Sequence, residues 1–154
     1  MRKSFFCYLL LFFILISCNS NSVYRKLDKN FDANQWKSSD IKTYEFVLKD
    51  DISKGKILLK FAHVFDYQFE SVPIHIEILY PNSEIEKRTI TLQLKDKNGK
   101  EIGDCSGDIC DLNFKILENI NLQKGMYSIK LSNDFKNGYL PNVLAVGIEV
   151  LKKE

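Results

Sequence analysis

The sequence lacks the short motifs that mark common enzyme families. It contains no G-x-S-x-G nucleophile elbow, no H-E-x-x-H metal motif and no glycine-rich phosphate loop. Its two histidines, His63 and His75, both lie in segments with the pattern of strands, and no C-x-x-C pair accompanies them. A zinc site is therefore not expected. We expect a protein that is not an enzyme and that needs no cofactor.

A long apolar segment is also missing. A helix needs about 20 apolar residues to cross a bilayer, whereas the apolar run Phe5–Ile16 is shorter and is followed by polar residues. Arg2 and Lys3 precede this run, and the sequence LISC closes it at residues 15–18. A positively charged start, an apolar core and a small residue before the cleavage site form the layout of a signal peptide. The sequence LISC resembles the lipobox of bacterial lipoproteins. We therefore predict a signal peptide over residues 1–17, whose removal leaves Cys18 with a diacylglycerol on its thiol. A secretory leader cut elsewhere is the alternative.

The chain without this leader has no excess of charge of either sign. The full sequence carries 22 basic and 20 acidic side chains, and Arg2 and Lys3 leave with the leader. The remaining chain is formally neutral, so it has no basic field that would attract nucleic acid. The predicted partners are the membrane, through the lipid at Cys18, and other proteins.

Residues 18–42 are predicted to be a lipid-anchored tether that docks partly on the domain. Ser and Asn at the start of the segment favour a flexible linker, whereas Tyr24 and Phe31 are apolar anchors. Trp36 is the only tryptophan. We interpret it as a core-edge residue that covers one end of the fold, with a ligand or partner contact as the alternative.

Sustained helical periodicity is absent, and an alternation of period two runs through the sequence from Thr43 onward. Successive side chains of a strand point to opposite faces, so this alternation indicates half-buried strands. The pattern predicts strands at residues 44–48, 57–61, 74–79, 89–95, 112–117, 127–132 and 146–151. Several short strands separated by turn residues predict an all-β fold over residues 43–154. It would be an antiparallel β-sandwich of the jelly-roll or immunoglobulin-like type.

The four cysteines divide into separate roles. Cys7 leaves with the leader and Cys18 takes the lipid, so Cys105 and Cys110 remain as an even pair in an oxidising compartment. We predict a structural disulfide between them. Aspartates nearby offer a weaker alternative, a Ca²⁺ site, since Ca²⁺ takes carboxylate oxygens in irregular loops. Their spacing does not match the EF-hand pattern, so no metal is predicted. The aspartates are Asp104, Asp108 and Asp111.

Three aromatic residues spaced by two, Phe65, Tyr67 and Phe69, offer a possible contact surface. Exposed on one face, the rings would form a stacking platform for sugar, which makes a carbohydrate-binding lipoprotein module the alternative function. The interpretation that we prefer places these rings at the rim of the sandwich, where they fill space.

Several segments in order carry a resemblance to a known family. They are the lipobox at Cys18, Asn34–Trp36, Val64–Tyr67, Tyr80–Asn82, Leu94–Gly99 with Gly103–Leu112, and Leu140–Val150. In the order and spacing of these segments, the chain resembles the gliding-motility lipoprotein GldH family of Bacteroidetes over nearly its whole length. The resemblance implies a cell-envelope lipoprotein that contributes to gliding motility or the associated secretion machinery. It would act through contacts with other proteins of that machinery, and the resemblance implies no catalytic residues.

The residues after Cys18 bear on location. Asn19–Ser22 contains no acid, whereas surface-exported lipoproteins of that phylum often carry acidic residues there. We therefore expect a lipid-anchored protein of the cell envelope, held on the outer membrane and facing the periplasm.

Overall fold

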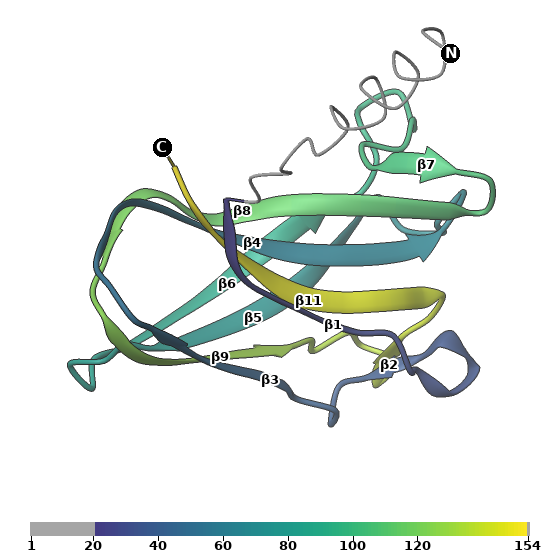
Figure 1. Ribbon diagram of the computed structural model, residues 1–154. Coiled ribbons are helices and arrows are strands. Elements are labelled where there is room, and N and C mark those ends of the chain that lie inside the picture. Colours follow the sequence, from purple (N-terminus) through teal and green to yellow (C-terminus); the bar gives the residue numbers. More distant parts are fainter. Residues whose placement is uncertain (1–20, 154) are drawn as a thin grey trace, which may run out of the picture.

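The computed structural model describes residues 21–153, which form two antiparallel β-sheets packed face to face (Figure 1). The all-β sandwich expected from the alternating pattern is thereby confirmed. The predicted signal peptide and Cys18 lie outside the described residues. No helix within residues 21–153 has the length and apolar character needed to span a bilayer.

Five strands form the first sheet, in the order β1-β11-β4-β8-β7. They are β1 (Ser22–Asp28), β4 (Ile52–Val64), β7 (Asp104–Ser106), β8 (Ile109–Leu122) and β11 (Val143–Lys152). β4 and β8 extend well beyond the segments that alternation predicted. The reason is a set of register shifts between them, because a bulge breaks strict alternation while the strand continues.

Four strands form the second sheet, in the order β3-β9-β5-β6. They are β3 (Lys42–Leu48), β5 (Ser71–Leu79), β6 (Ile85–Gln93) and β9 (Gly125–Ser132). Two short strands, β2 (Trp36–Lys37) and β10 (Tyr139–Leu140), pair with each other, and the 3-10 turn η2 (Asp32–Asn34) precedes β2. Each segment that the sequence predicts as a strand overlaps one of these strands.

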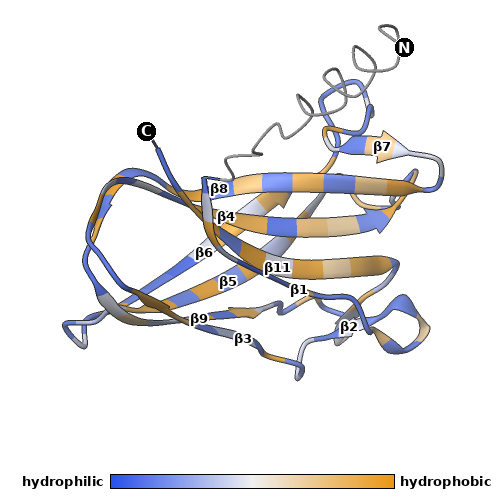
Figure 2. Ribbon diagram, in the orientation of Figure 1, coloured by the Kyte–Doolittle hydropathy of each residue, from blue (hydrophilic) through white to orange (hydrophobic). Residues whose placement is uncertain are grey.

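Alternate residues of the facing strands fill the space between the sheets. Figure 2 shows the corresponding bands of hydrophobic and hydrophilic residues along β4 and β8. Each large aliphatic side chain buried in this way contributes about 2 kcal/mol of hydrophobic stabilisation. Fully buried examples are Ile57 and Leu59 of β4, Ile74 and Ile78 of β5, Ile129 of β9 and Val146 and Ile148 of β11.

The segment predicted as a tether contributes a strand to the first sheet. β1 pairs with β11 at the sheet edge. Tyr24 stacks on Phe46 with ring centroids 4.7 Å apart, and the Lys26 ammonium lies 5.8 Å from the ring centre of Tyr44. The ring of Tyr24 and the stem of Lys26 thus cover apolar surface between the sheets. An edge strand can therefore be rich in polar residues, which a search for hydrophobic alternation does not detect.

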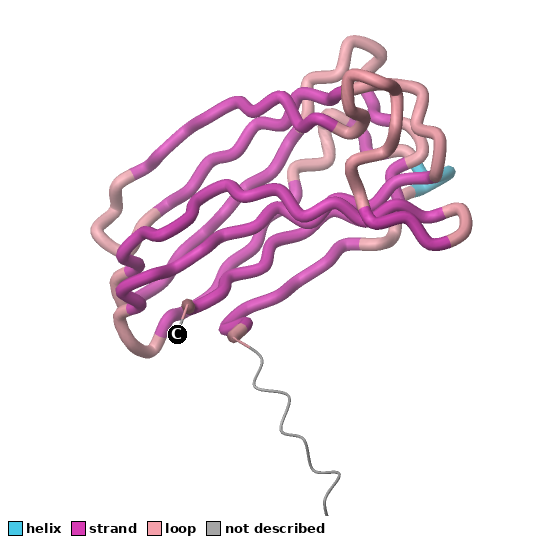
Figure 3. Tube along the Cα trace, turned by 90° about the horizontal axis from the view of Figure 1, so that it is seen from above, coloured by secondary structure: helices cyan, strands magenta, loops and turns pink. Residues whose placement is uncertain are grey.

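The two ends of the sandwich carry different features. At one end the carbonyl of Asn21 accepts a hydrogen bond of 2.9 Å from the N–H of Lys152, so the start of β1 and the end of β11 lie side by side (Figure 3). We call this the N-terminal end. At the opposite end β4 finishes beside the start of β8, and β7 folds back on β8. We call this the hairpin end.

Two tyrosine side chains are held in buried positions by hydrogen bonds to backbone. The Tyr44 hydroxyl donates to the carbonyl of Val146 at 3.0 Å, and the Tyr67 hydroxyl donates to the carbonyl of Pro141 at 2.7 Å. Burial raises the pKa of Tyr44 and of Tyr67 well above the ordinary value of 10.0, and the nearby Asp28 adds to the rise at Tyr44. Both hydroxyls therefore stay protonated in the folded chain at alkaline pH.

These tyrosines predict a loss of stability in alkali. Unfolded tyrosines ionise near their ordinary pKa, whereas Tyr44 and Tyr67 keep their protons, so above about pH 10 the native state binds more protons than the unfolded state. The stabilisation is complete below that pH, and the free energy of unfolding falls as the pH rises. Denaturant unfolding of Tyr44→Phe should show a shallower decline over the alkaline range than the native chain. Equal slopes would contradict this assignment.

Candidate functional site at the hairpin end

A disulfide closes the hairpin between β7 and β8. Cys105 and Cys110 are register partners, with Cα atoms 4.0 Å apart and their sulfur atoms bonded, which confirms the predicted pairing. The turn between them contains Gly107 at a φ of +58°, a left-handed conformation that glycine adopts without steric cost. The disulfide therefore holds the short strand β7 against the sheet.

The segment after β4 is tied to this hairpin. The backbone N–H of Phe65 donates to the carbonyl of Asp108 at 2.9 Å, and Val64 pairs with Ile109. Phe65 is 52% exposed and Ile109 is 48% exposed. Two large apolar side chains thus reach solvent from backbone that the disulfide-closed hairpin holds in place.

An open cavity of about 410 Å³ lies beside the hairpin. The Lys95 ammonium lies 2.8 Å from the carboxylate of Asp66, one of the wall residues, and lowers the pKa of that carboxyl. Asp66 is therefore an anion at neutral pH. The cavity is lined by Phe65, Asp66, Gly99, Lys100, Glu101, Gly103 and Cys105.

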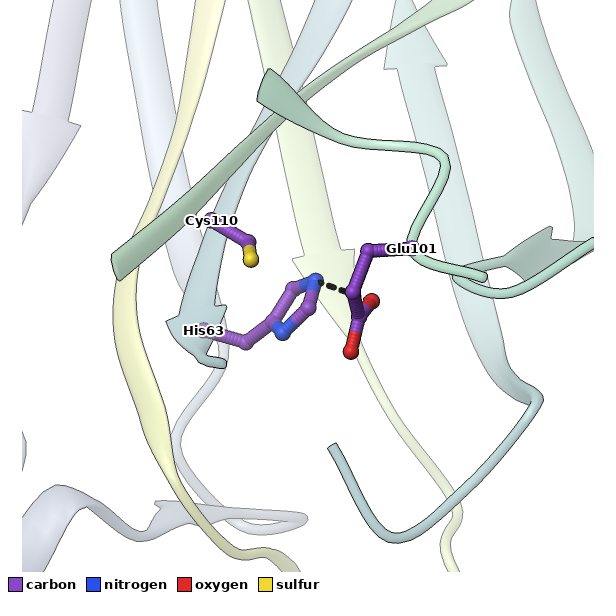
Figure 4. Close-up of side chains that lie close together, drawn as sticks. All are labelled: His63, Glu101 and Cys110. Carbon is purple, nitrogen blue, oxygen red and sulfur yellow. Dashed lines mark ion pairs between the residues drawn. The ribbon is translucent and has the colours of Figure 1, made fainter. Parts of the chain in front are cut away.

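Glu101 also belongs to a buried pair with His63 (Figure 4). His63 lies near the end of β4 and is fully buried, and the side chain of Glu101, from the segment between β6 and β7, is 8% exposed. The Nε2 atom of His63 lies 3.8 Å from Oε2 of Glu101. The Nδ1 atom lies 2.9 Å from the carbonyl oxygen of Val64, and Oε1 of Glu101 accepts a 3.0 Å hydrogen bond from the N–H of Tyr67.

One polar atom on each partner has no hydrogen bond, namely Nε2 of His63 and Oε2 of Glu101. A carbonyl oxygen can only accept, so the proton of a neutral His63 ring belongs on Nδ1, beside the carbonyl of Val64. Nε2 is then an acceptor that faces another acceptor.

The disulfide limits metal binding at this pair. Within residues 21–153, His63, Glu101 and Cys110 form the one group of three potential metal-ligating side chains whose ligand atoms lie within 4.8 Å of one another. The sulfur of Cys110 is bonded to Cys105, and cysteine ligates metals as a thiolate. Two potential ligands remain. The residues of the Ca²⁺ alternative do not form such a group; they are Asp104, Asp108 and Asp111.

The aromatic residues of the predicted contact surface do not share an exposed face. Phe65 is exposed and Phe69 is half-buried, whereas Tyr67 is 1% exposed and its ring packs edge-on to His63 with centroids 5.0 Å apart. Trp36 is also fully buried. The flat platform that a sugar would need is therefore not formed. Phe65 is the exposed member of the predicted contact residues.

Sequence reasoning missed Glu101 and assigned His63 to an ordinary sheet position. The alternation of β4 contains a signal for His63, because Leu59 and Phe61 face the core and residue 63 is the next inward position. Glu101 gives no such signal. It follows a polar turn, and its backbone forms an isolated antiparallel β-bridge with Lys95. Its side chain becomes buried only where the chain passes from the second sheet to the first.

His75 lies in a different environment, on the outer side of the second sheet. Its Nδ1 atom lies 2.7 Å from Oγ1 of Thr89, and its Nε2 atom lies 3.0 Å from Oδ2 of Asp134. Both ring nitrogens therefore have partners. The two histidines are thus distinguished by their contacts, and only His63 carries a ring nitrogen without a hydrogen bond.

Loss of the disulfide should have a moderate effect on stability. Replacing Cys105 with serine should lower the free energy of unfolding by about 2 kcal/mol, because the bond closes only a small loop in the unfolded chain. Denaturant unfolding measures the change. The native chain treated with a thiol reductant is the control and should show a similar decrease. Mass spectrometry that finds two free thiols in the unreduced chain would contradict the bond.

Comparison with known proteins identifies relatives that span the sandwich. A family model described as GldH lipoprotein matches residues 22–150. A protein from Christiangramia forsetii, named as a gliding motility lipoprotein GldH homolog, is 23% identical over 100% of this chain and 99% of its own length. The match therefore includes β1 at the N-terminal end as well as the disulfide-closed hairpin.

Two solved structures align with most of the chain but overlap poorly. An exo-β-1,3-galactanase from Phanerochaete chrysosporium is 10% identical, with a TM-score of 0.36 over 81% of this chain and 29% of its own. A CocE/NonD family hydrolase from Staphylococcus aureus is 7% identical, with a TM-score of 0.38 over 84% of this chain and 31% of its own. This chain spans less than a third of either protein, and at these scores the likeness carries no argument about activity.

Proposed function

The chain belongs to the GldH lipoprotein family. From that premise we propose that it is a lipid-anchored, non-enzymatic envelope protein of gliding motility. We propose further that it binds another protein through its hairpin end. In this proposal residues 1–17 are removed and Cys18 takes the lipid. The binding surface, which we call the hairpin surface, comprises Phe65, Ile109 and the wall of the adjacent cavity.

The observation that carries the proposal is the exposure of apolar side chains on fixed backbone. Phe65 and Ile109 are each about half exposed, and the hydrogen bond from Phe65 to Asp108 joins their two segments. Association costs free energy for ordering the loops of an interface as well as its side chains. The loop part of that cost is small where the backbone is held before the partner arrives. Aromatic side chains in such places dominate many interfaces.

Charges around this surface define the chemistry of the partner. Asp104, Asp108 and Asp111 of the hairpin are all exposed, whereas the Asp66 carboxylate in the cavity wall is already paired with Lys95. A complementary partner would therefore carry lysine or arginine around an apolar centre. Because such rim charges are screened by salt, association should slow as the salt concentration rises.

We place the anchor in the outer membrane, with the domain in the periplasm. The support for this is that Asn19–Ser22 contains no acidic residue. Protease added to intact cells should then leave the domain intact. Removal of the domain by such treatment would contradict this location.

Replacement of Phe65 by serine tests the proposed contact. In a gliding strain that lacks the native gene, the Phe65→Ser protein should restore colony spreading poorly, because a lost aromatic anchor weakens binding by about 2 kcal/mol or more. Its free energy of unfolding should change by less than about 0.5 kcal/mol, since the side chain is exposed. Immunoblots of the membrane fraction check that the amount of protein is unchanged.

The matched control for this experiment is Ile41→Ser. Ile41 is 57% exposed and lines a cavity with His75 on the second sheet, away from the hairpin surface. This variant should restore spreading as well as the native chain does. Full spreading by both Phe65→Ser and Ile109→Ser would contradict a contact at the hairpin surface.

A further inference from the structure

The N-terminal end of the sandwich gathers the residues nearest to the proposed lipid. Asn21 follows Cys18 by three residues, which span about 10 Å when fully extended. The carbonyl of Asn21 accepts the N–H of Lys152, and the N–H of Lys153 donates to the carbonyl of Lys54 at 3.0 Å. The start of the described chain, the start of β4 and the end of β11 are therefore tied together within reach of the anchor.

Lysines line a cavity at this place. The cavity has a volume of about 180 Å³, and its walls include Lys54, Lys56, Lys152 and Lys153. Lys56 forms an ion pair of 3.1 Å with Glu118. The other three ammonium groups form no ion pair with any residue of 21–153. Three lysines without an ion-pair partner among residues 21–153 thus line one small hollow.

This local charge is not visible in the overall balance of the chain. Acidic groups at the same end lie in the turn between β3 and β4, where the Asp51 carboxylate accepts the N–H of Lys124 at 2.7 Å. Asp50 and Lys49 stand in the same turn. Charges of both signs thus occur together in this turn, whereas the described residues that line the cavity include four lysines and no acidic side chain.

Exposed apolar side chains accompany the lysines. Val47 and Met126 are register partners near the ends of β3 and β9, and they are 67% and 60% exposed. β3 finishes and β9 begins at the N-terminal end, so both side chains lie there. The lysines belong to the first sheet and these two side chains to the second, so the same end of the sandwich presents both kinds of residue. Lysines together with exposed apolar residues form the combination that attracts a protein surface to the interface of an anionic bilayer.

We propose that the cavity lined by Lys54, Lys152 and Lys153 binds the phosphate headgroup of an anionic lipid in the membrane that holds Cys18. The attraction of lysines to such a surface acts within about 10 Å. This distance is similar to the extended length of the chain between Cys18 and Asn21. The bound headgroup sets the orientation of the sandwich, with the N-terminal end against the membrane and the hairpin surface pointing away from it. This inference rests on the proposed anchorage at Cys18, but the headgroup site itself is independent of the lipid.

Vesicle sedimentation tests the site without the anchor. The mature chain, residues 18–154 with Cys18→Ser, is mixed with vesicles of phosphatidylcholine alone or with added phosphatidylglycerol. It should bind the anionic vesicles, more weakly at high salt. The variant K54Q/K152Q/K153Q should bind them about 100-fold more weakly, as expected for three lysines near an anionic surface. Its thermal unfolding should match that of the parent chain, because these side chains are exposed.

The matched control removes the same charge at the other end. Lys37, Lys97 and Lys136 are exposed and lie in β2 and in turns at the hairpin end. K37Q/K97Q/K136Q should bind the anionic vesicles within about twofold of the parent chain, since these lysines face away from the bilayer. Equal binding by the two triple variants, or equal binding to both kinds of vesicle, would overturn the proposal.

Two further outcomes separate the possible sources of failure. Inorganic phosphate should displace the chain from the vesicles better than chloride at the same ionic strength, because it shares the chemistry of the headgroup. Equal displacement by the two salts would overturn the assignment of a phosphate site. Mass spectrometry of the native protein reports separately whether Cys18 carries lipid. A lipidated protein whose unlipidated form ignores anionic vesicles would refute the headgroup site and leave the anchorage intact.

Discussion

Replacing Trp36 with alanine should lower the free energy of unfolding by about 4 kcal/mol. The indole is completely buried, and its N–H donates to the carbonyl of Asp40 at 2.8 Å. The ring of Phe31 packs against it with centroids 6.5 Å apart. Alanine would leave a cavity at the position of the indole and a carbonyl without its donor. Urea unfolding of the two chains measures the difference.

A second replacement distinguishes packing from hydrogen bonding at this position. Trp36→Phe keeps a large ring and loses the N–H, so it should cost about 1–2 kcal/mol. If Trp36→Ala instead cost less than about 1 kcal/mol and reduced colony spreading, the indole would act in a partner contact. That result would contradict its assignment to the core.

Replacing Cys18 with alanine should release the protein from the membrane. The thiol is the proposed acceptor of the lipid, and stable anchorage requires more than one acyl chain because each buried CH₂ contributes only about 0.8 kcal/mol. The three lysines at the N-terminal end are too few to substitute for it. The variant should lose incorporation of labelled palmitate, move to the soluble fraction and fail to restore spreading. Fractionation with detergent and metabolic labelling measures these changes.

Cys7 provides the matched control for this replacement. It lies inside the predicted leader, so Cys7→Ala should leave labelling, membrane association and spreading unchanged. Continued palmitate labelling of Cys18→Ala would contradict the assignment of the lipid to Cys18.

The regular part of the fold could be predicted because it depends on local alternation. Ile74–Ile78 of β5 buries every second side chain, and Tyr127–Leu131 of β9 does so with the small Ser128 buried in addition. The apolar period of two is visible in the sequence of both segments. β1 could not be recognised in this way. Its role depends on long-range partners, such as the stacking of Tyr24 on Phe46 and the position of Lys26 over Tyr44.

The candidate site shows the same division between local and long-range information. The disulfide could be predicted because Cys105 and Cys110 are close in sequence and are the pair left over from the leader and the lipid. The burial of Glu101 against His63 could not, since it depends on where one irregular segment crosses between sheets. The exposure of Phe65 beside a buried Tyr67 depends likewise on a loop rather than on a regular strand.

The central claim is that an anchored domain binds another protein through its hairpin surface, and crosslinking in living cells tests it most directly. A photoreactive amino acid is placed at position 65, and in a parallel strain at position 41. Irradiation of gliding cells should give a discrete protein adduct from position 65 and none from position 41, with the adduct recovered in the membrane fraction. Absence of any adduct from position 65, in cells that still spread, would contradict the claim.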